Sequence, residues 1–85
     1  MLGDLHKSEI VFYLKKAGIT VIKSVRALNL VLQEMGVQRH SGDHWVTTKE
    51  GVSRTIYKME VCDPDAWHPS IVNEIIDYLK QKEHN

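Results

Sequence analysis

The stretch SVRALNLVLQEMGVQRHSGDHWVTTKEG, Ser24–Gly51, decides which fold this sequence predicts. Ser24 is a favourable N-cap residue, and the helix that it opens runs to about Met35 and ends at Gly36. Beyond Gly36 the spacing of apolar residues changes from the helical period to the shorter period of strands. The stretch therefore predicts a helix followed directly by a β-hairpin.

The predicted helix has a core face and a polar face. Its apolar side chains recur at the spacing of one buried stripe: Leu28, Val31, Leu32 and Met35. Arg26, Asn29 and Gln33 lie on other faces and are free to contact a partner. The predicted strands Val37–Arg39 and Trp45–Thr47 enclose "HSGDH", a glycine-containing hairpin turn.

A further helix is predicted near the N-terminus. It runs from about Lys7 to Ala17, with Asp4 or Ser8 as its cap and Gly18 as its stop. Its predicted core face consists of Ile10, Leu14 and Ala17, with Val11 and Tyr13 at the edges.

The remaining segments complete the expected order of elements. The β-branched run Ile19–Ile22 predicts a short extended piece. "TTKEGV" predicts a turn or one helical turn capped by Thr48, and Thr55–Cys62 predicts a third strand, although Ile56 fits its alternation poorly. Pro69 suits the first turn of a last helix. The apolar face of that helix is Ile71, Val72, Ile75, Ile76 and Leu79.

Composition limits the class of protein. With 85 residues and 42% hydrophobic residues, the chain is long enough for one domain with a modest core. The single cysteine, Cys62, excludes an internal disulfide framework and favours a reducing compartment. No segment approaches the roughly 18 continuous apolar residues of a membrane span. We therefore expect a cytoplasmic protein.

The charge is zero overall but unevenly distributed. Residues 1–58 carry nine Lys and Arg against five Asp and Glu, a net charge of +4. Residues 59–85 carry two Lys and Arg against six Asp and Glu, a net charge of −4. Such a chain can present a basic face to an anionic partner. The basic and the acidic side chains also both suit ordinary solvated surface.

The order helix, short strand, helix, hairpin, strand, helix is that of a winged helix-turn-helix. We expect one α+β domain over residues 1–85, with three helices and a small, three-stranded antiparallel sheet. In this fold the second helix is the recognition helix and the hairpin is the wing. Many small α+β domains share this order, so the pattern alone does not single out one fold.

The candidate DNA-binding residues are of two kinds. Base edges are expected to be read by Arg26, Asn29 and Gln33, because Arg pairs bidentately with guanine and Asn or Gln with adenine. Contacts with the sugar-phosphate backbone are expected from residues that flank this helix or form the hairpin: Lys23, Arg39, His40 and Lys49.

Several of these side chains also suit structural roles. Asn29 is at least as well suited to bracing the hairpin as to reading a base. Trp45 is expected to pack in the core with Leu28 and Leu32, and base stacking is the alternative. Trp67 is expected to anchor the last helix on the sheet.

The same residues resemble the winged-helix C-terminal module of KilA-type and related phage antirepressors. There a Ser or Thr opens the second helix, followed by LN..L...G.Q, a basic hairpin, a Trp and T..G. The matching positions are Ser24, Leu28, Asn29, Leu32, Gly36, Gln38, Trp45, Thr48 and Gly51, and a later W.P.....I...L pattern matches Trp67, Pro69, Ile75 and Leu79. The resemblance covers roughly Leu5 to Leu79. It implies a winged helix and a phage or prophage regulator; the separate N-terminal domain of such antirepressors is not part of this sequence.

The sequence also bears on enzymatic activity, on protein binding and on self-association. "RHSGDH" and "CDPDAWH" gather reactive side chains but show no metal-ligand spacing, so we expect no enzyme, no cofactor and no metal. The acidic last helix and the neutral total favour an alternative to binding double-stranded DNA, an adaptor that holds a protein partner. Leu30, Val11 and Phe12 fit no single core face and are expected to mark a homodimer contact.

Overall fold

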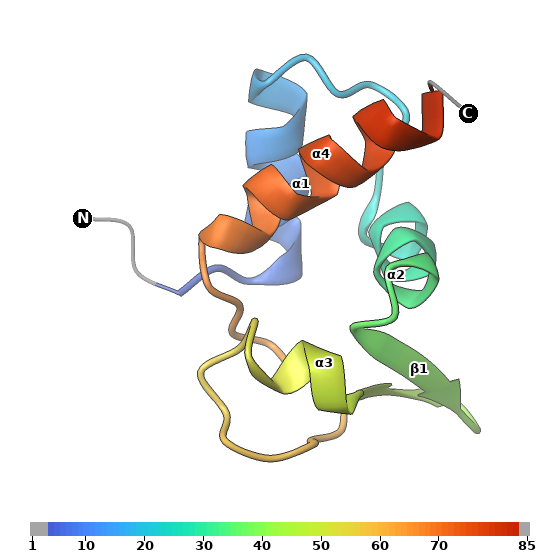
Figure 1. Ribbon diagram of the computed structural model, residues 1–85, viewed down its shortest axis with the longest axis vertical. Coiled ribbons are helices and arrows are strands. Elements are labelled where there is room, and N and C mark those ends of the chain that lie inside the picture. The colour runs from blue at the N-terminus through green and yellow to red at the C-terminus, as the bar shows by residue number, and fades with distance from the viewer. Residues whose placement is uncertain (1–3, 84–85) are drawn as a thin grey trace.

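The computed structural model describes residues 4–83, which form a small α+β unit of four helices and one two-stranded antiparallel hairpin (Figure 1). The helices of the N-terminal half are α1, Lys7–Lys16, and α2, Val25–Glu34. The hairpin consists of β1, Gln38–Ser41, and β2, His44–Thr47. A single helical turn, α3, Lys49–Val52, follows, and the last helix is α4, Ser70–Glu83.

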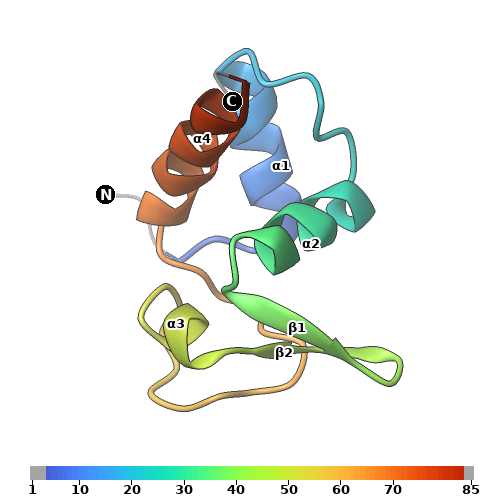
Figure 2. The same ribbon diagram turned by 45° about the vertical axis from the view of Figure 1, so that its right-hand side comes forward.

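α1 and α4 lie at one end of the molecule, and the hairpin lies at the other. In Figures 1 and 2, α4 lies at the top beside α1, the hairpin lies at the bottom with α3, and α2 lies between. α1 packs against both α4 and α2, and α2 in turn packs against β1. The hairpin therefore projects from the helical layer with α2 directly beside it.

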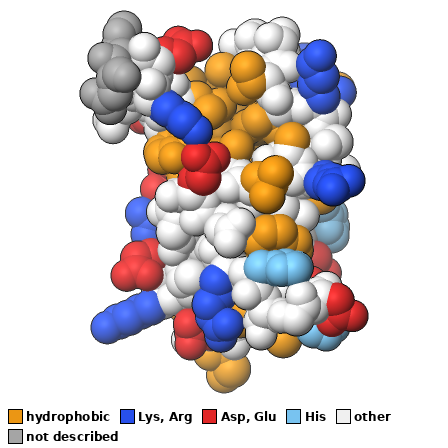
Figure 3. All heavy atoms as spheres, turned by 90° about the vertical axis from the view of Figure 1, so that its right-hand side faces the viewer, with side chains coloured by type: hydrophobic (Ala, Val, Ile, Leu, Met, Phe, Trp, Pro, Cys, Tyr) orange, Lys and Arg blue, Asp and Glu red, His pale blue; other side chains and the backbone are white. Residues whose placement is uncertain are grey.

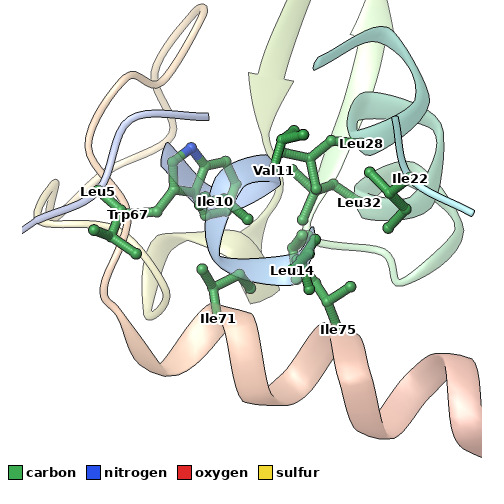
Figure 4. Packing of buried hydrophobic residues seen from close by; sticks show 11 residues of the cluster. Leu5, Ile10, Val11, Leu14, Ile22, Leu28, Leu32, Trp67, Ile71 and Ile75 are labelled. Atoms are coloured by element: carbon green, nitrogen blue, oxygen red, sulfur yellow. The ribbon is translucent and has the colours of Figure 1, made fainter. Parts of the chain in front are cut away.

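The core lies where the three longer helices meet. Ile71 and Ile75 of α4 point toward Leu14 of α1, and Leu28 and Leu32 of α2 approach from the other side (Figure 4). All five side chains are fully buried, as the spacing of apolar residues in the sequence predicts. Val31, Met35, Val72, Ile76 and Leu79 pack against this cluster and are partly buried, which confirms the predicted faces of α2 and α4.

Local capping signals explain where the helices begin and end. The Ser24 hydroxyl accepts a hydrogen bond from the backbone N–H of Ala27 at 3.2 Å, which confirms the predicted N-cap of α2. Gly18 and Gly36 follow α1 and α2 with φ angles of 88° and 83°, a region that glycine adopts without steric cost. α1 begins at Lys7 as predicted, but the prediction of its capping residue is wrong. His6 is its N-cap residue, and the Glu9 carboxylate accepts the His6 backbone N–H in place of a bond from Asp4 or Ser8.

The predicted hairpin forms, with strands that reach closer to the turn: β1 begins one residue and ends two residues later than predicted, and β2 begins one residue earlier. Gln38 pairs with Thr47 and His40 with Trp45, so these four side chains lie on one face and Arg39 lies on the other. The connection is a two-residue turn that begins with Gly42 at a φ of 62°, as a type II′ turn requires.

Two predicted strands are absent from the described residues. Ile19–Ile22 is irregular, although Ile22 is buried in the core. Thr55–Cys62 forms two isolated bridges, Thr55 with Trp67 and Cys62 with Val46, and the chain turns away just after it at Asp63, which has a φ of 47° and is followed by Pro64. The described sheet thus has two strands where three were predicted. The described residues form four helices where three were predicted, because the segment capped by Thr48 forms the helical turn α3.

Four predictions about burial need correction. Ala17 is exposed, and Val11 is buried in the core, so Val11 marks no surface contact. Trp45 is half-buried outside the core cluster. Trp67 is fully buried as expected, but its backbone bridges Leu5 and Thr55, which lie outside the two-stranded sheet. No helix in the described part of the chain is long and apolar enough to cross a membrane.

Candidate nucleic-acid interface

A groove separates α2 from the hairpin on the side turned toward the viewer in Figure 3. It has a volume of about 630 Å³ and is open to solvent. It is lined by one face of α2 and one face of the hairpin: Val25, Arg26, Asn29, Leu30, Gln33, His40 and Trp45. The structure thus brings together all three predicted base-reading residues and one predicted backbone-contacting residue.

The α2 side of the groove mixes polar and apolar side chains. Arg26 and Gln33 are exposed, and Leu30, which lies between them on the same face, is 53% exposed. Val25 at the start of the helix is 38% exposed. The groove therefore offers a cation and an amide beside two aliphatic side chains.

Asn29 is engaged inside the protein. Its side-chain oxygen accepts hydrogen bonds from the Lys7 ammonium at 2.6 Å and from the Gln38 side-chain amide at 3.1 Å. The Gln38 amide also donates to the Asn29 backbone carbonyl at 3.2 Å, and its own oxygen accepts from Lys7 at 3.1 Å. Gln38 is only 1% exposed, so these bonds tie α1, α2 and β1 together in a buried network. The geometry favours the bracing role of Asn29.

Lys7 is the charged member of this network. Burial lowers the pKa of its amine from 10.5 to about 8, and the negative charge of Asp63 opposes that shift. The ammonium also lies 6.0 Å from the centre of the Trp67 ring. A cation is retained here because two amide oxygens accept its hydrogen bonds.

The hairpin side of the groove is formed by an aromatic pair. The rings of His40 and Trp45 lie with their centres 4.7 Å apart and their planes tilted by 52°. The Asp63 carboxylate holds the strand by accepting the Trp45 backbone N–H at 3.1 Å, and this hydrogen bond lowers the pKa of Asp63. Trp45 is half-buried outside the core cluster and lines the groove between the hairpin and α2.

Close contacts at the base of the hairpin fix its direction relative to α2. The Thr48 hydroxyl donates to the carbonyl of Gly36 and accepts the Gly51 backbone N–H, joining the end of α2 to α3. Gly51 lies so close to Val37 that an added Cβ would overlap the Val37 carbonyl oxygen. This junction has room only for glycine at residue 51.

Of the predicted phosphate contacts, His40 lines the groove, whereas the other three are exposed outside it. Lys23 precedes the cap of α2, Arg39 lies on the opposite hairpin face from His40, and Lys49 begins α3. Within residues 4–83, none of these three side chains, nor Arg26, has an ion-pair partner.

Several nearby carboxylates, in contrast, have side-chain partners. Glu34 pairs with Lys82 at 2.7 Å, Glu74 with Arg54 at 3.0 Å, and Asp63 with the His44 ring at 3.3 Å. Asp43 at the hairpin tip also contacts His44. In Figure 3 basic and acidic side chains are interspersed on this face, and hydrophobic side chains show between them. Arg26 on α2 and Arg39 on the hairpin thus lack an ion-pair partner among the described residues, but the basic side chains form no continuous patch.

Sequence reasoning missed two features of this site. Lys7 was not singled out, because its partners lie 22 and 31 residues away and nothing in the local sequence marks them. Leu30 stood out as an apolar residue off the core stripe, but its place in one groove with Val25 and Trp45 depends on how the hairpin packs. The residues that the structure describes hold no cluster of His, Cys, Asp or Glu suited to a metal ion.

Comparisons of the chain with protein-family models, with curated proteins and with solved structures find no match.

Proposed function

We propose that this chain is a small winged-helix module that binds double-stranded DNA in a phage-type regulatory protein. The observation that carries the proposal is the set of exposed, unpaired cations on α2 and the hairpin, beside a groove lined by Arg26 and Gln33. An α-helix fits the major groove of DNA, and an adjacent hairpin can meet the sugar-phosphate backbone.

The roles of the candidate residues follow from their contacts. Arg26 and Gln33 are free to bond base edges. Asn29 would have to give up its bonds to Lys7 and Gln38 before it could pair with adenine, so it is assigned to positioning the hairpin. Phosphate contacts are assigned to the flanking residues: Lys23, Arg39, His40 and Lys49.

The antirepressor-like motif supports this assignment. Ser24 caps α2, Asn29 and Gln38 bond to each other, and Thr48 bonds to the residue after the helix. These motif residues therefore hold α2 and the hairpin in one orientation, as a reading module requires. α4 lies at the other end of the molecule from the hairpin (Figure 1), and its Glu74 carboxylate is paired with Arg54.

Charge-neutralising variants test the proposal. Lys23→Gln or Arg39→Gln should weaken binding to every duplex and lower the salt slope by about one for each lost contact. Lys80→Gln is the matched control, because it removes the same charge from the exposed surface of α4. Arg26→Ala should instead relax sequence preference at a cost of about 1–3 kcal/mol. Equal effects of Lys23→Gln and Lys80→Gln, measured by fluorescence anisotropy, would refute the assignment.

A protein-binding adaptor is the second candidate. It is favoured by the aliphatic part of the groove, where Val25 and Leu30 are exposed beside a half-buried Trp45. An adaptor of this kind would bind its partner with little dependence on salt, whereas DNA binding falls steeply as salt rises.

A further inference from the structure

An exposed leucine lies in the middle of the polar face of α2. Leu30 is 53% exposed and lines the groove between Arg26, one turn before it, and Gln33, one turn after it. The core needs no contribution from this position, since Leu28 and Leu32 are fully buried on the other side of the helix. The site where base reading is proposed thus contains an apolar side chain that packing does not require.

The neighbouring polar residue does not take over the centre of this face. The Asn29 oxygen is bonded to both Lys7 and Gln38, and Gln38 is buried, so the Asn29 side chain is held toward the hairpin base. The outward stripe of α2 is therefore Arg26, Leu30 and Gln33. Over seven residues this stripe spans roughly 10 Å, which corresponds to about three base pairs.

We propose that Leu30 is a specificity-determining residue that contacts the methyl group of a thymine next to a guanine bonded by Arg26. This inference rests on the proposed DNA-binding function. The C5-methyl of thymine is the apolar group that base edges present in the major groove, and aliphatic side chains contact it there. Val25, exposed in the same groove, extends the apolar surface around that methyl group.

The experiment begins with a pool of random duplexes from which the wild-type protein selects its tightest sites at low salt. Each thymine of an enriched duplex is then replaced by uracil, which removes only the methyl group. Binding of wild type and Leu30→Ala is measured for every duplex. Met59→Ala is the matched control, because Met59 is an exposed apolar residue in the loop between α3 and α4.

The expected result is one thymine whose replacement weakens wild-type binding about three- to fourfold, the effect of burying one methyl group. Leu30→Ala should bind the thymine and uracil duplexes equally, while Met59→Ala should behave as wild type. If every uracil duplex binds as well as its parent, or if no sequence is enriched although DNA binds, the thymine contact is overturned and DNA binding stands. If no duplex binds at low salt, the proposed function itself is overturned.

Discussion

At the scale of single residues, Lys7 shows how one side chain joins three elements. Its ammonium bonds Asn29 of α2 and Gln38 of β1 from the first residue of α1. Gln38 is the buried centre of these contacts, so the orientation of the hairpin depends on a polar network. Such a network specifies geometry more sharply than apolar contacts do, since each bond requires a particular donor and acceptor.

The titration of Lys7 gives a testable pH dependence. Its pKa is about 8 in the folded protein and 10.5 in the unfolded chain, so between these values the unfolded chain binds more protons at this residue. The free energy of unfolding should therefore rise with pH across this window. Urea unfolding of wild type and Lys7→Met, compared at about pH 7 and about pH 10, should show the wild type gaining stability relative to the variant. If the free energies of unfolding of wild type and Lys7→Met differ by the same amount at both pH values, the lowered pKa of Lys7 is contradicted.

At the scale of elements, α2 depends on its buried stripe. Leu32 is fully buried, so Leu32→Ala should lower the free energy of unfolding by roughly 2–5 kcal/mol, a large share of the stability of a small domain. Leu30→Ala on the exposed side of the same helix is the control and should change stability little. Thermal unfolding of both variants checks this, and an unchanged midpoint in Leu32→Ala would mean that the stripe faces elsewhere.

The junction of α3 with the hairpin has no room for a side chain at residue 51. Gly51→Ala would place a Cβ against the carbonyl oxygen of Val37, and the resulting overpacking should cost about 1–3 kcal/mol or more. Glu50→Ala, an exposed change in the same helical turn, should cost little. Chemical denaturation of the two variants measures the difference, and equal stabilities would show that the junction is looser than described.

The elements also show how far the sequence predicts this structure. Ser24, Gly18 and Gly36 act on the neighbouring backbone, so the ends of the first two helices follow from local chemistry. The third strand does not form because Thr55–Cys62 bridges Trp67 at one end and Val46 at the other, so it pairs with no single strand along its length. In the candidate site, the polar residues of α2 were predicted from periodicity. The bracing role of Asn29 was predicted as an alternative, but its partner Lys7 was not, since it lies 22 residues away in the chain.

At the scale of the whole molecule, size bears on association. The described residues measure 32 × 31 × 20 Å, so one copy covers at most about one turn of a DNA duplex, roughly 34 Å. Phe12 is 55% exposed on α1, where it contacts Tyr13 and Lys16, and it is available for a contact between two copies.

We predict a homodimer that uses Phe12. Phe12→Asp should shift a dimer to a monomer in sedimentation at high concentration, because a buried carboxylate at an interface costs free energy. Met59→Asp, which adds the same charge at an exposed apolar residue in the loop before α4, is the control. A wild-type protein that sediments as a pure monomer at high concentration would remove the dimer.

DNA binding by the α2–hairpin surface can be measured by a salt titration of the wild-type protein on a random duplex. With Lys23, Arg39 and Lys49 on phosphates, the logarithm of the binding constant should fall against the logarithm of salt concentration with a slope of about −3. We expect an affinity that is measurable at low salt and that falls along this slope as the salt concentration rises. The contradicting result is no binding to any duplex even at low salt, which would leave the protein-adaptor function in its place.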